Sequence, residues 1–309
     1  MRVLLAAALL LSACTSSAAN PTRDLPMAPV PAPPSSPPAP GSSASASQPA
    51  RAPDHPGAWQ PKHVVVVVEE NHSYRDVIGS PFAPYMNRLA RHGASLTNMH
   101  AITHPSEPNY LALFSGSTQG VIGDPCPVTR RSRTLANQLL HAHRTFAGYS
   151  EGLPHTGSAV CSRGNYVRRH APWTNFTNVP ASVGRPLRKL PRHYGNLPDV
   201  SFVIPDLQHD MHDGTIGQAD TWLRSHLGAY VTWARTHDSV LVLTWDEDDL
   251  GIGNHIPTVI TGSHVRPGRY ATHANHYRLL RTLEWLLGLP GISRSKAVAP
   301  ITQVWARSG

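Results

Sequence analysis

A run of five valines, Val64 to Val68, constrains the fold of this chain more than any other segment. An unbroken run of β-branched residues is typical of a strand buried on both faces, as in a parallel sheet covered by helices. The run ends in the polar residues Glu69, Glu70 and Asn71. Because open α/β sheets bind ligands at the carboxyl ends of their strands, we expect a site here. The ordinary alternative is a pair of solvated acidic loop residues.

The first 14 residues have the features of an export signal. Arg2 precedes an apolar run that is too short to cross a bilayer as a permanent helix. The run ends in LSAC, residues 11–14, which resembles a bacterial lipobox. We therefore expect an exported protein, either anchored to the cell membrane through a lipid on Cys14 or secreted. The alternative for Cys14 is a chance cysteine in an ordinary signal peptide.

Residues 15–57 are rich in Pro, Ser and Ala and contain few large apolar side chains. Such a segment cannot bury enough surface to offset its chain entropy, so we predict a disordered tether. The remaining residues, 58–309, suffice for one sizeable α/β domain, which we expect to be a monomer.

Apolar runs alternate with amphipathic segments through this domain. We predict strands at 95–100, 200–204, 239–245 and 256–260, and helices at 82–92, 109–115, 134–143, 220–236 and 277–287. This alternation predicts a mainly parallel central sheet with helices on both faces. Residues 152–199 are long for a structureless connection, so we expect them to be functional or partly structured.

The formal net charge of +8 favours anionic partners. Export argues against nucleic acid, and no nucleic-acid-binding motif is visible. Phosphorylated small molecules and phospholipid head groups remain, beside the alternative of a charge that serves only solubility. With Cys14 assigned to the anchor, Cys126 and Cys161 are left, and an oxidising compartment predicts a disulfide between them.

Two of the predicted strands end in acidic clusters, Glu70-Asn71 and Asp246-Glu247. If these strands are neighbours in the sheet, three carboxylates and an amide oxygen meet at one place. A divalent cation would relieve their repulsion, and oxygen ligands favour Ca, Mg or Mn, with Zn as a further option. The alternative is two independent acidic loops.

Ser106 precedes Pro108, which is suited to the first turn of a helix. A hydroxyl at the positive end of a helix dipole, near free backbone N–H groups, is a candidate nucleophile beside a phosphate. Asn109, one turn further, is a candidate donor to a phosphate oxygen. The common role of a serine at this position, a helix cap, stays open.

Two other segments carry basic and imidazole side chains. The first, 205–214, contains His209 and His212, which are candidate metal ligands, or one of them a general acid. The second, 165–173, contains Arg168, Arg169 and His170, and it either binds phosphate or is a charged loop.

In this order the motifs resemble the bacterial phosphoesterase family of acid phosphatases and phospholipases C, within the alkaline phosphatase-like superfamily. The resemblance covers residues 62–290 and rests on EENHSY, HPSEPNYLALFSG, RRHAPW, DMHDG, TWDED and NHYRLLRTLEWLLGL.

The resemblance implies a role for each matching residue. The metal ligands would be Glu70, Asn71, Asp246 and Glu247. The nucleophile would be Ser106, the phosphate site would include His170, His212 and Asn109, and further candidates are His104, His209 and His255.

We therefore expect a metal-dependent phosphatase that hydrolyses phosphate monoesters through a phosphoserine, with phosphoinositides among the substrates that the resemblance suggests. In this mechanism a protonated His212 would assist the leaving oxygen. The alternatives are a phospholipase C-type phosphodiesterase and a non-catalytic lipoprotein that binds anions.

Overall fold

The computed structural model describes residues 59–251 and 253–306. The expected export signal, the anchor at Cys14 and the tether lie outside the described residues. Within the described ranges, every helix is too short or too polar to cross a bilayer.

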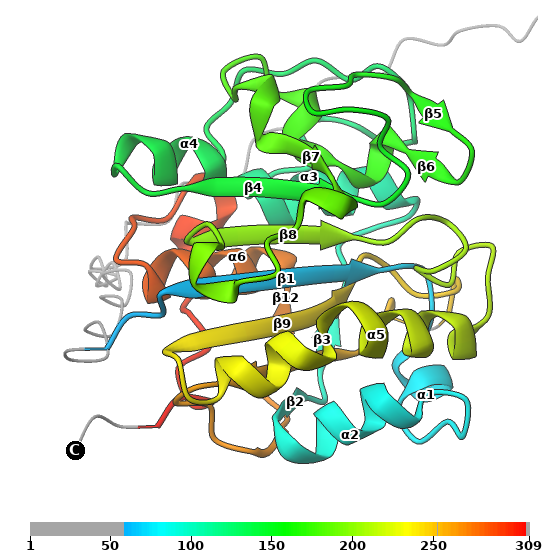
Figure 1. Cartoon of the computed structure of the whole chain (residues 1–309), viewed down its shortest axis with the longest axis vertical. Helices are drawn as coiled ribbons and strands as arrows, with labels where there is room; N and C mark the ends of the chain where they lie inside the picture. The colour runs from blue at the N-terminus through cyan, green and yellow to red at the C-terminus, as the bar shows by residue number, and fades with distance from the viewer. Residues whose placement is uncertain (1–58, 252, 307–309) are drawn as a thin grey trace, which may run out of the picture. The chain divides into compact units, whose positions relative to one another are not determined.

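An eight-stranded sheet forms the centre of the domain, in the order β11-β2-β10-β9-β1-β8-β4-β7 (Figure 1). Its strands are β1 (His63–Glu69), β2 (Ala94–Leu96), β4 (Phe146–Ser150), β7 (Gly184–Pro186), β8 (Val200–Ile204), β9 (Ser239–Trp245), β10 (Thr258–Gly262) and β11 (Gly268–Tyr270). β1 runs parallel to both of its neighbours, β8 and β9, and β4 runs parallel to β8 and β7. Only β10 breaks this pattern within the described sheet, because it pairs antiparallel with β9 and β2.

Helices cover both faces of the sheet, as the alternation predicts. They are α1 (Tyr74–Val77), α2 (Pro84–His92), α3 (Ser106–Ser115), α4 (Leu135–His141), α5 (Ile216–Ala234) and α6 (His276–Leu286). In Figure 1, α2 and α5 lie in front of the sheet and α3 and α6 behind it. Each valine of Val64–Val68 is at most 1% exposed, which is why this strand needs no polar face.

The predicted fold class is confirmed, and the elements differ mainly at their ends. The strand predicted at 256–260 is displaced by two residues, and the one at 95–100 divides into β2 and β3 (Met99–His100). Helix α5 begins at Ile216 rather than 220, because Thr215 and Gln218 form a capping box there.

The long segment 152–199 is partly structured. It contains the hairpin β5 (Ser162–Arg163) and β6 (Tyr166–Val167), followed by the 3-10 helix η1 (Arg168–His170). The predicted disulfide is present, with the Cα atoms of Cys126 and Cys161 5.8 Å apart.

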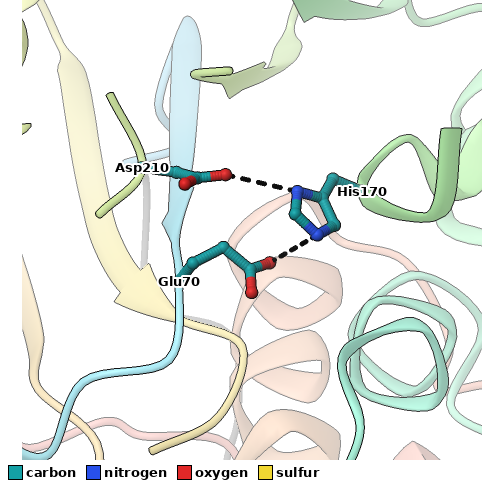
Figure 2. Close-up of side chains that lie close together, drawn as sticks. All are labelled: Glu70, His170 and Asp210. Carbon is teal, nitrogen blue, oxygen red and sulfur yellow. Dashed lines mark ion pairs between the residues drawn. The ribbon is translucent and has the colours of Figure 1, made fainter. Parts of the chain in front are cut away.

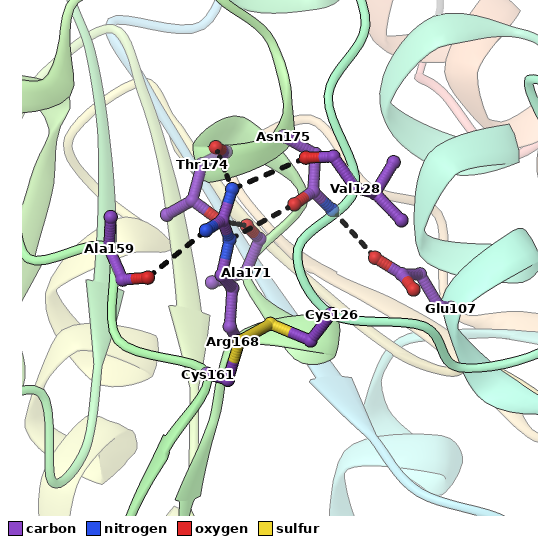
Figure 3. The surroundings of a disulfide bond; sticks show 9 residues. All are labelled: Glu107, Cys126, Val128, Ala159, Cys161, Arg168, Ala171, Thr174 and Asn175. Carbon is purple, nitrogen blue, oxygen red and sulfur yellow. Dashed lines mark hydrogen bonds between the residues drawn. A yellow bond between two sulfur atoms is a disulfide. The ribbon is translucent and has the colours of Figure 1, made fainter.

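Arg168 ties this segment together beside the disulfide (Figure 3). Its buried guanidinium donates to the carbonyl oxygens of Ala159 and Thr174, at 3.0 and 2.8 Å, and to the side chain of Asn175. Arg168 is therefore structural, and it fixes the short helix that carries His170.

Candidate active site

The acidic ends of β1 and β9 meet at one edge of the sheet. Glu69 is paired with Trp245 in the parallel register, so the next residues of each strand, Glu70 and Asp246, leave the sheet side by side. Glu70, Asp246 and Glu247 each offer one oxygen within 4.8 Å of the others, and all three are buried. The structure thus brings the two predicted acidic clusters together.

Ser106 is the first residue of α3, and its hydroxyl faces these carboxylates. Its Oγ lies 3.0 Å from Glu70 Oε2 and 3.2 Å from Glu247 Oε1, so it can donate its proton to either one. The N-cap residue is Pro105, and its side chain accepts no hydrogen bond. The helix-cap alternative for Ser106 is therefore wrong, because its side chain is turned toward acidic groups and not toward the helix backbone.

Glu70 is held from its other side by two aromatic side chains. The hydroxyl of Tyr110 donates to Glu70 Oε1 over 2.6 Å, and His170 Nε2 lies 3.0 Å from the same oxygen. The Tyr110 ring stacks on His170, with 5.0 Å between the ring centroids. This orients the carboxylate so that Oε2 is left for Ser106.

His170 bridges two carboxylates (Figure 2). Its Nδ1 lies 3.3 Å from Asp210 Oδ2, on the side opposite Glu70. A neutral imidazole carries only one N–H, so two carboxylate partners indicate the doubly protonated ring. Burial by itself would lower the pKa of His170, but Glu70 and Asp210 outweigh it and raise the pKa to about 9.

The imidazolium of His170 in turn controls Glu70. Burial alone would raise the pKa of Glu70, but the charge of His170 and the hydrogen bonds from His170 and Tyr110 lower it from its ordinary value. Glu70 is therefore ionised, which suits a group that accepts a proton from a nucleophile.

Asp246 and Glu247 have the opposite electrostatic character. Burial, followed by the charge of Glu70, raises the pKa of Asp246 well above its usual range and that of Glu247 to about 8. Both carboxylate oxygens of Asp246 are buried and lack a hydrogen-bond partner among the described residues. A bound cation would offset both the repulsion between these buried carboxylates and the lack of a partner for the Asp246 oxygens. The oxygen donors present suit Ca, Mg or Mn. The residues present therefore fit the divalent ion expected from the sequence.

A cavity of about 450 Å³ opens onto Ser106 and Glu247. Its other lining residues are Asn71, His104, Pro105, Asp124, His212, Asp248, Asp249 and Leu250. Asn71 therefore lines the same cavity as Glu247, another of the predicted metal ligands. His104 lies between two carboxylates, with Nδ1 2.8 Å from Glu247 Oε2 and Nε2 3.4 Å from Asp248 Oδ1.

Asn109 is buried and has its amide group occupied. Its Oδ1 accepts the backbone N–H groups of Ile102 and Thr103, and its Nδ2 donates to the carbonyl of Thr103 over 2.8 Å. Nδ2 also lies 3.5 Å from Glu247 Oε2. Asn109 thus holds the loop that leads into Ser106, whereas the sequence suggested direct donation to phosphate.

His212 lines the cavity, and the partners of its two ring nitrogens indicate which nitrogen carries the proton. Its Nδ1 lies 2.7 Å from Asp213 Oδ1, and its Nε2 lies 3.3 Å from Arg169 Nη2. Because a guanidinium only donates, Nε2 accepts from Arg169 and the ring proton is on Nδ1. In this arrangement His212 has no proton to give from Nε2.

A carboxylate occupies the start of α3, where the sequence suggested free backbone N–H groups for a phosphate. Asp124 Oδ1 accepts the N–H of Glu107 over 2.9 Å, and Asp124 Oδ2 lies 3.7 Å from Arg169 Nε. This N–H is therefore free for a substrate only if Asp124 moves.

Two further histidine candidates lie outside this cavity. His209 Nδ1 lies 3.0 Å from both Glu151 Oε2 and Asp206 Oδ1, in a separate cluster, so His209 and His212 are not one ligand pair. His255 stacks on Tyr74, with 4.7 Å between the ring centroids.

Sequence reasoning missed Tyr110, Asp210 and Asp124. A readable signal existed for Tyr110, because residues four apart on a helix share a face and Tyr110 follows Ser106 by four. The pattern gave no direction for the side chain of Asp210, which turns away from that of His209. Asp124 lies in a loop whose path only the fold defines.

Comparison with known proteins identifies the family of the chain. Residues 80–290 match the phosphoesterase family. The chain belongs to that family. It is 51% identical over 246 residues to the phosphatidylinositol-3-phosphatase of Mycobacterium tuberculosis, covering 79% of this chain and 82% of that protein. It is 29% identical over 228 residues to the phosphate-repressible acid phosphatase of Penicillium chrysogenum, covering 68% of this chain and 55% of that one.

The fold is that of the alkaline phosphatase superfamily. A member of that superfamily from Vibrio parahaemolyticus aligns with a TM-score of 0.51 at 15% identity, over 81% of this chain and 72% of the other. The phosphonate monoester hydrolase of Agrobacterium radiobacter aligns with a TM-score of 0.52 at 13% identity, over 80% of this chain and 79% of the other. With its family and its phosphatase relatives, this phosphoesterase is a hydrolase of phosphoric ester bonds.

Proposed function

We propose that this phosphoesterase is an exported, metal-dependent phosphatase that cleaves phosphate monoesters through a phosphoserine at Ser106. The observation that carries the proposal is the 3.0 Å contact between Ser106 Oγ and Glu70 Oε2 at the cavity. A nucleophile, a base within hydrogen-bond reach and groups that orient the base are the parts that covalent catalysis needs. The phosphatidylinositol-3-phosphatase relative supports phosphoinositides as one substrate class.

The first step transfers the phosphoryl group to Ser106. The hydroxyl proton of Ser106 passes to Glu70, the bond from Ser106 Oγ to phosphorus forms, and the bond between phosphorus and the leaving oxygen breaks. Tyr110 and His170 keep Glu70 oriented and ionised until it accepts this proton. Water then hydrolyses the phosphoserine, which releases phosphate and restores Ser106.

The metal would be held by Glu70, Asp246 and Glu247, with Asn71 beside them. When bound, the cation would neutralise the crowded carboxylates and lower the pKa of the Ser106 hydroxyl. Asn109 contributes by holding the loop in front of Ser106 in place.

The leaving oxygen needs a proton, and two imidazoles line the cavity. The tautomer of His212 leaves Nε2 without one, so we assign His212 to positioning Arg169 and propose His104 as the proton donor. A test compares His104→Gln and His212→Gln on p-nitrophenyl phosphate and on an alkyl phosphate, since nitrophenolate leaves without protonation. His104→Gln should reduce the alkyl rate far more than the aryl rate, and an equal reduction of both would refute the assignment.

The proposal as a whole is tested by phosphate release from p-nitrophenyl phosphate and from phosphatidylinositol 3-phosphate, with and without a chelator. The control for Ser106→Ala is Ser115→Ala, because Ser115 lies at the other end of α3 and donates to the backbone carbonyl of Leu111. Activity that survives in Ser115→Ala, and is abolished by Ser106→Ala and by chelation, supports the proposal.

Other outcomes assign other functions. Equal activity of wild type and Ser106→Ala would refute the nucleophile. Cleavage of phosphatidylcholine to diacylglycerol without monoesterase activity would identify a phospholipase C. Ligand binding with neither activity, under every metal condition, would identify an anion-binding protein.

A further inference from the structure

Four large apolar side chains are exposed among the described residues, and they lie on loops at one edge of the sheet. They are Phe82, Ile122, Val160 and Leu250, with exposed fractions of 70%, 90%, 40% and 80%. Single exposed apolar residues are common on soluble proteins, so their distribution and not their number is informative.

Two of these side chains are close to the candidate active site in the fold. Leu250 lines the cavity itself, in the loop after β9. Ile122 lies two residues before Asp124, another lining residue.

The other two are on loops at the same edge of the sheet. Val160 precedes Cys161, whose disulfide joins it to Cys126 in the loop of Asp124. The carbonyl oxygen of Phe82 lies beside Gly217, in the first turn of α5, which follows the loop at the carboxyl end of β8. All four therefore lie on loops at the edge at which β1, β8 and β9 end, the side on which Figure 1 shows α1 and the β5–β6 hairpin.

Arginines accompany the apolar side chains on this rim. Arg75, in α1 just after Asn71, has a side chain that is 80% exposed. Arg163 is exposed in the β5–β6 hairpin, and with Arg188 it lines a hollow beside Glu151, at the carboxyl end of β4. Apolar tips interspersed with arginines match the boundary of an anionic bilayer, where side chains enter the head-group region and cations pair with phosphates.

We propose that this rim docks the enzyme on an anionic lipid surface, with Phe82, Ile122, Val160 and Leu250 entering the head-group region and the cavity mouth facing the membrane. This rests on the proposed function, because docking in this orientation would deliver a phosphorylated lipid head group to Ser106. A lipid surface is the occupant that the rim favours, since its apolar side chains are separate tips on several loops, whereas protein partners bind continuous, closely packed patches.

The test uses Phe82→Glu/Ile122→Glu, because these two positions lie on different loops and neither belongs to the proposed catalytic machinery. The matched control, Ala142→Glu/Thr232→Glu, adds the same charge at exposed positions near the ends of α4 and α5, at the opposite edge of the sheet. Every version is the full chain with Cys14→Ser, so that no acyl anchor can form. Binding is measured by co-sedimentation with phosphatidylcholine vesicles that contain phosphatidylserine.

We expect wild type and control to bind these vesicles, and the rim variant to lose at least about tenfold in partitioning. Hydrolysis of phosphatidylinositol 3-phosphate in vesicles should fall in parallel, while hydrolysis of p-nitrophenyl phosphate stays within about twofold. Wild type that does not bind, or a rim variant that binds as wild type does, would overturn the docking proposal. Loss of binding in the rim variant of a protein with no phosphatase activity would support the docking and refute the proposed function.

Discussion

Removal of the Tyr110 hydroxyl is the smallest change that tests how Glu70 is activated. Tyr110→Phe removes the 2.6 Å hydrogen bond to Glu70 Oε1 and keeps the ring that stacks on His170. Hydrogen bonds to a charged group contribute about 1.5–3 kcal/mol. If the transition state loses all of this stabilisation in Tyr110→Phe, kcat/KM falls by about 10- to 150-fold.

The assay is steady-state hydrolysis of p-nitrophenyl phosphate at saturating metal, with the fold checked by circular dichroism. The control is Tyr166→Phe, because the Tyr166 hydroxyl is buried and makes no hydrogen bond within the described part of the chain. This control should keep its rate. A folded Tyr110→Phe protein with kcat/KM within about threefold of wild type would show that Glu70 needs no support from this hydroxyl.

Three further predictions follow from the structure. Asp246→Asn relieves the crowding of buried carboxylates, so the metal-free variant should melt at a temperature no lower than metal-free wild type. Ca, Mg or Mn at 100 times Kd should stabilise wild type by about 2.7 kcal/mol and should not stabilise the variant. An equal thermal shift of both proteins on metal addition would contradict the metal site. Asp124→Asn keeps an oxygen for the Glu107 N–H but removes the charge that competes with phosphate, so KM should fall with little change in kcat; an increase in KM would show that Asp124 assists substrate binding. Burial raises the pKa of Glu284, far from the cavity in sequence, from 4.5 to about 7, so the stability it contributes is complete below pH 4.5 and is lost as the pH rises through about 7. Glu284→Gln mimics the protonated form, so denaturant titrations should show its stability relative to wild type growing by about 3 kcal/mol between these pH values, and a pH-independent difference would refute the shift.

The part of the site that follows from strand order was the part that could best be predicted from the sequence, because parallel strands bring their carboxyl ends to one edge of a sheet. The apolar runs predicted a mainly parallel sheet, and the two acidic clusters would meet only if the strand Val64–Val68 and the strand before Asp246 were neighbours, which the structure shows them to be. The resemblance to the phosphoesterase family implied one metal site for Glu70, Asn71, Asp246 and Glu247, whereas the strand pattern alone left two independent acidic loops open. The disulfide was predicted from the expected oxidising compartment and from the two cysteines left after Cys14, and it is present.

The remaining parts of the site depend on side-chain directions that no pattern encodes. His209 and Asp210 are consecutive, yet one pairs with Glu151 and the other with His170. Asp124 reaches the start of α3 from a loop without periodicity. Arg168 and Arg169 are likewise adjacent, but one is a buried structural group and the other contacts His212. Such distinctions arise from tertiary packing.

The proposed mechanism requires that Ser106 carries the phosphoryl group during turnover. The most direct measurement is acid quenching of the enzyme during hydrolysis of p-nitrophenyl phosphate, followed by mass spectrometry of the peptide that contains Ser106. We expect a phosphoryl group on Ser106 in wild type and none in Ser106→Ala, which should also be inactive. Turnover without label on Ser106, or label on another residue, would contradict the proposed mechanism.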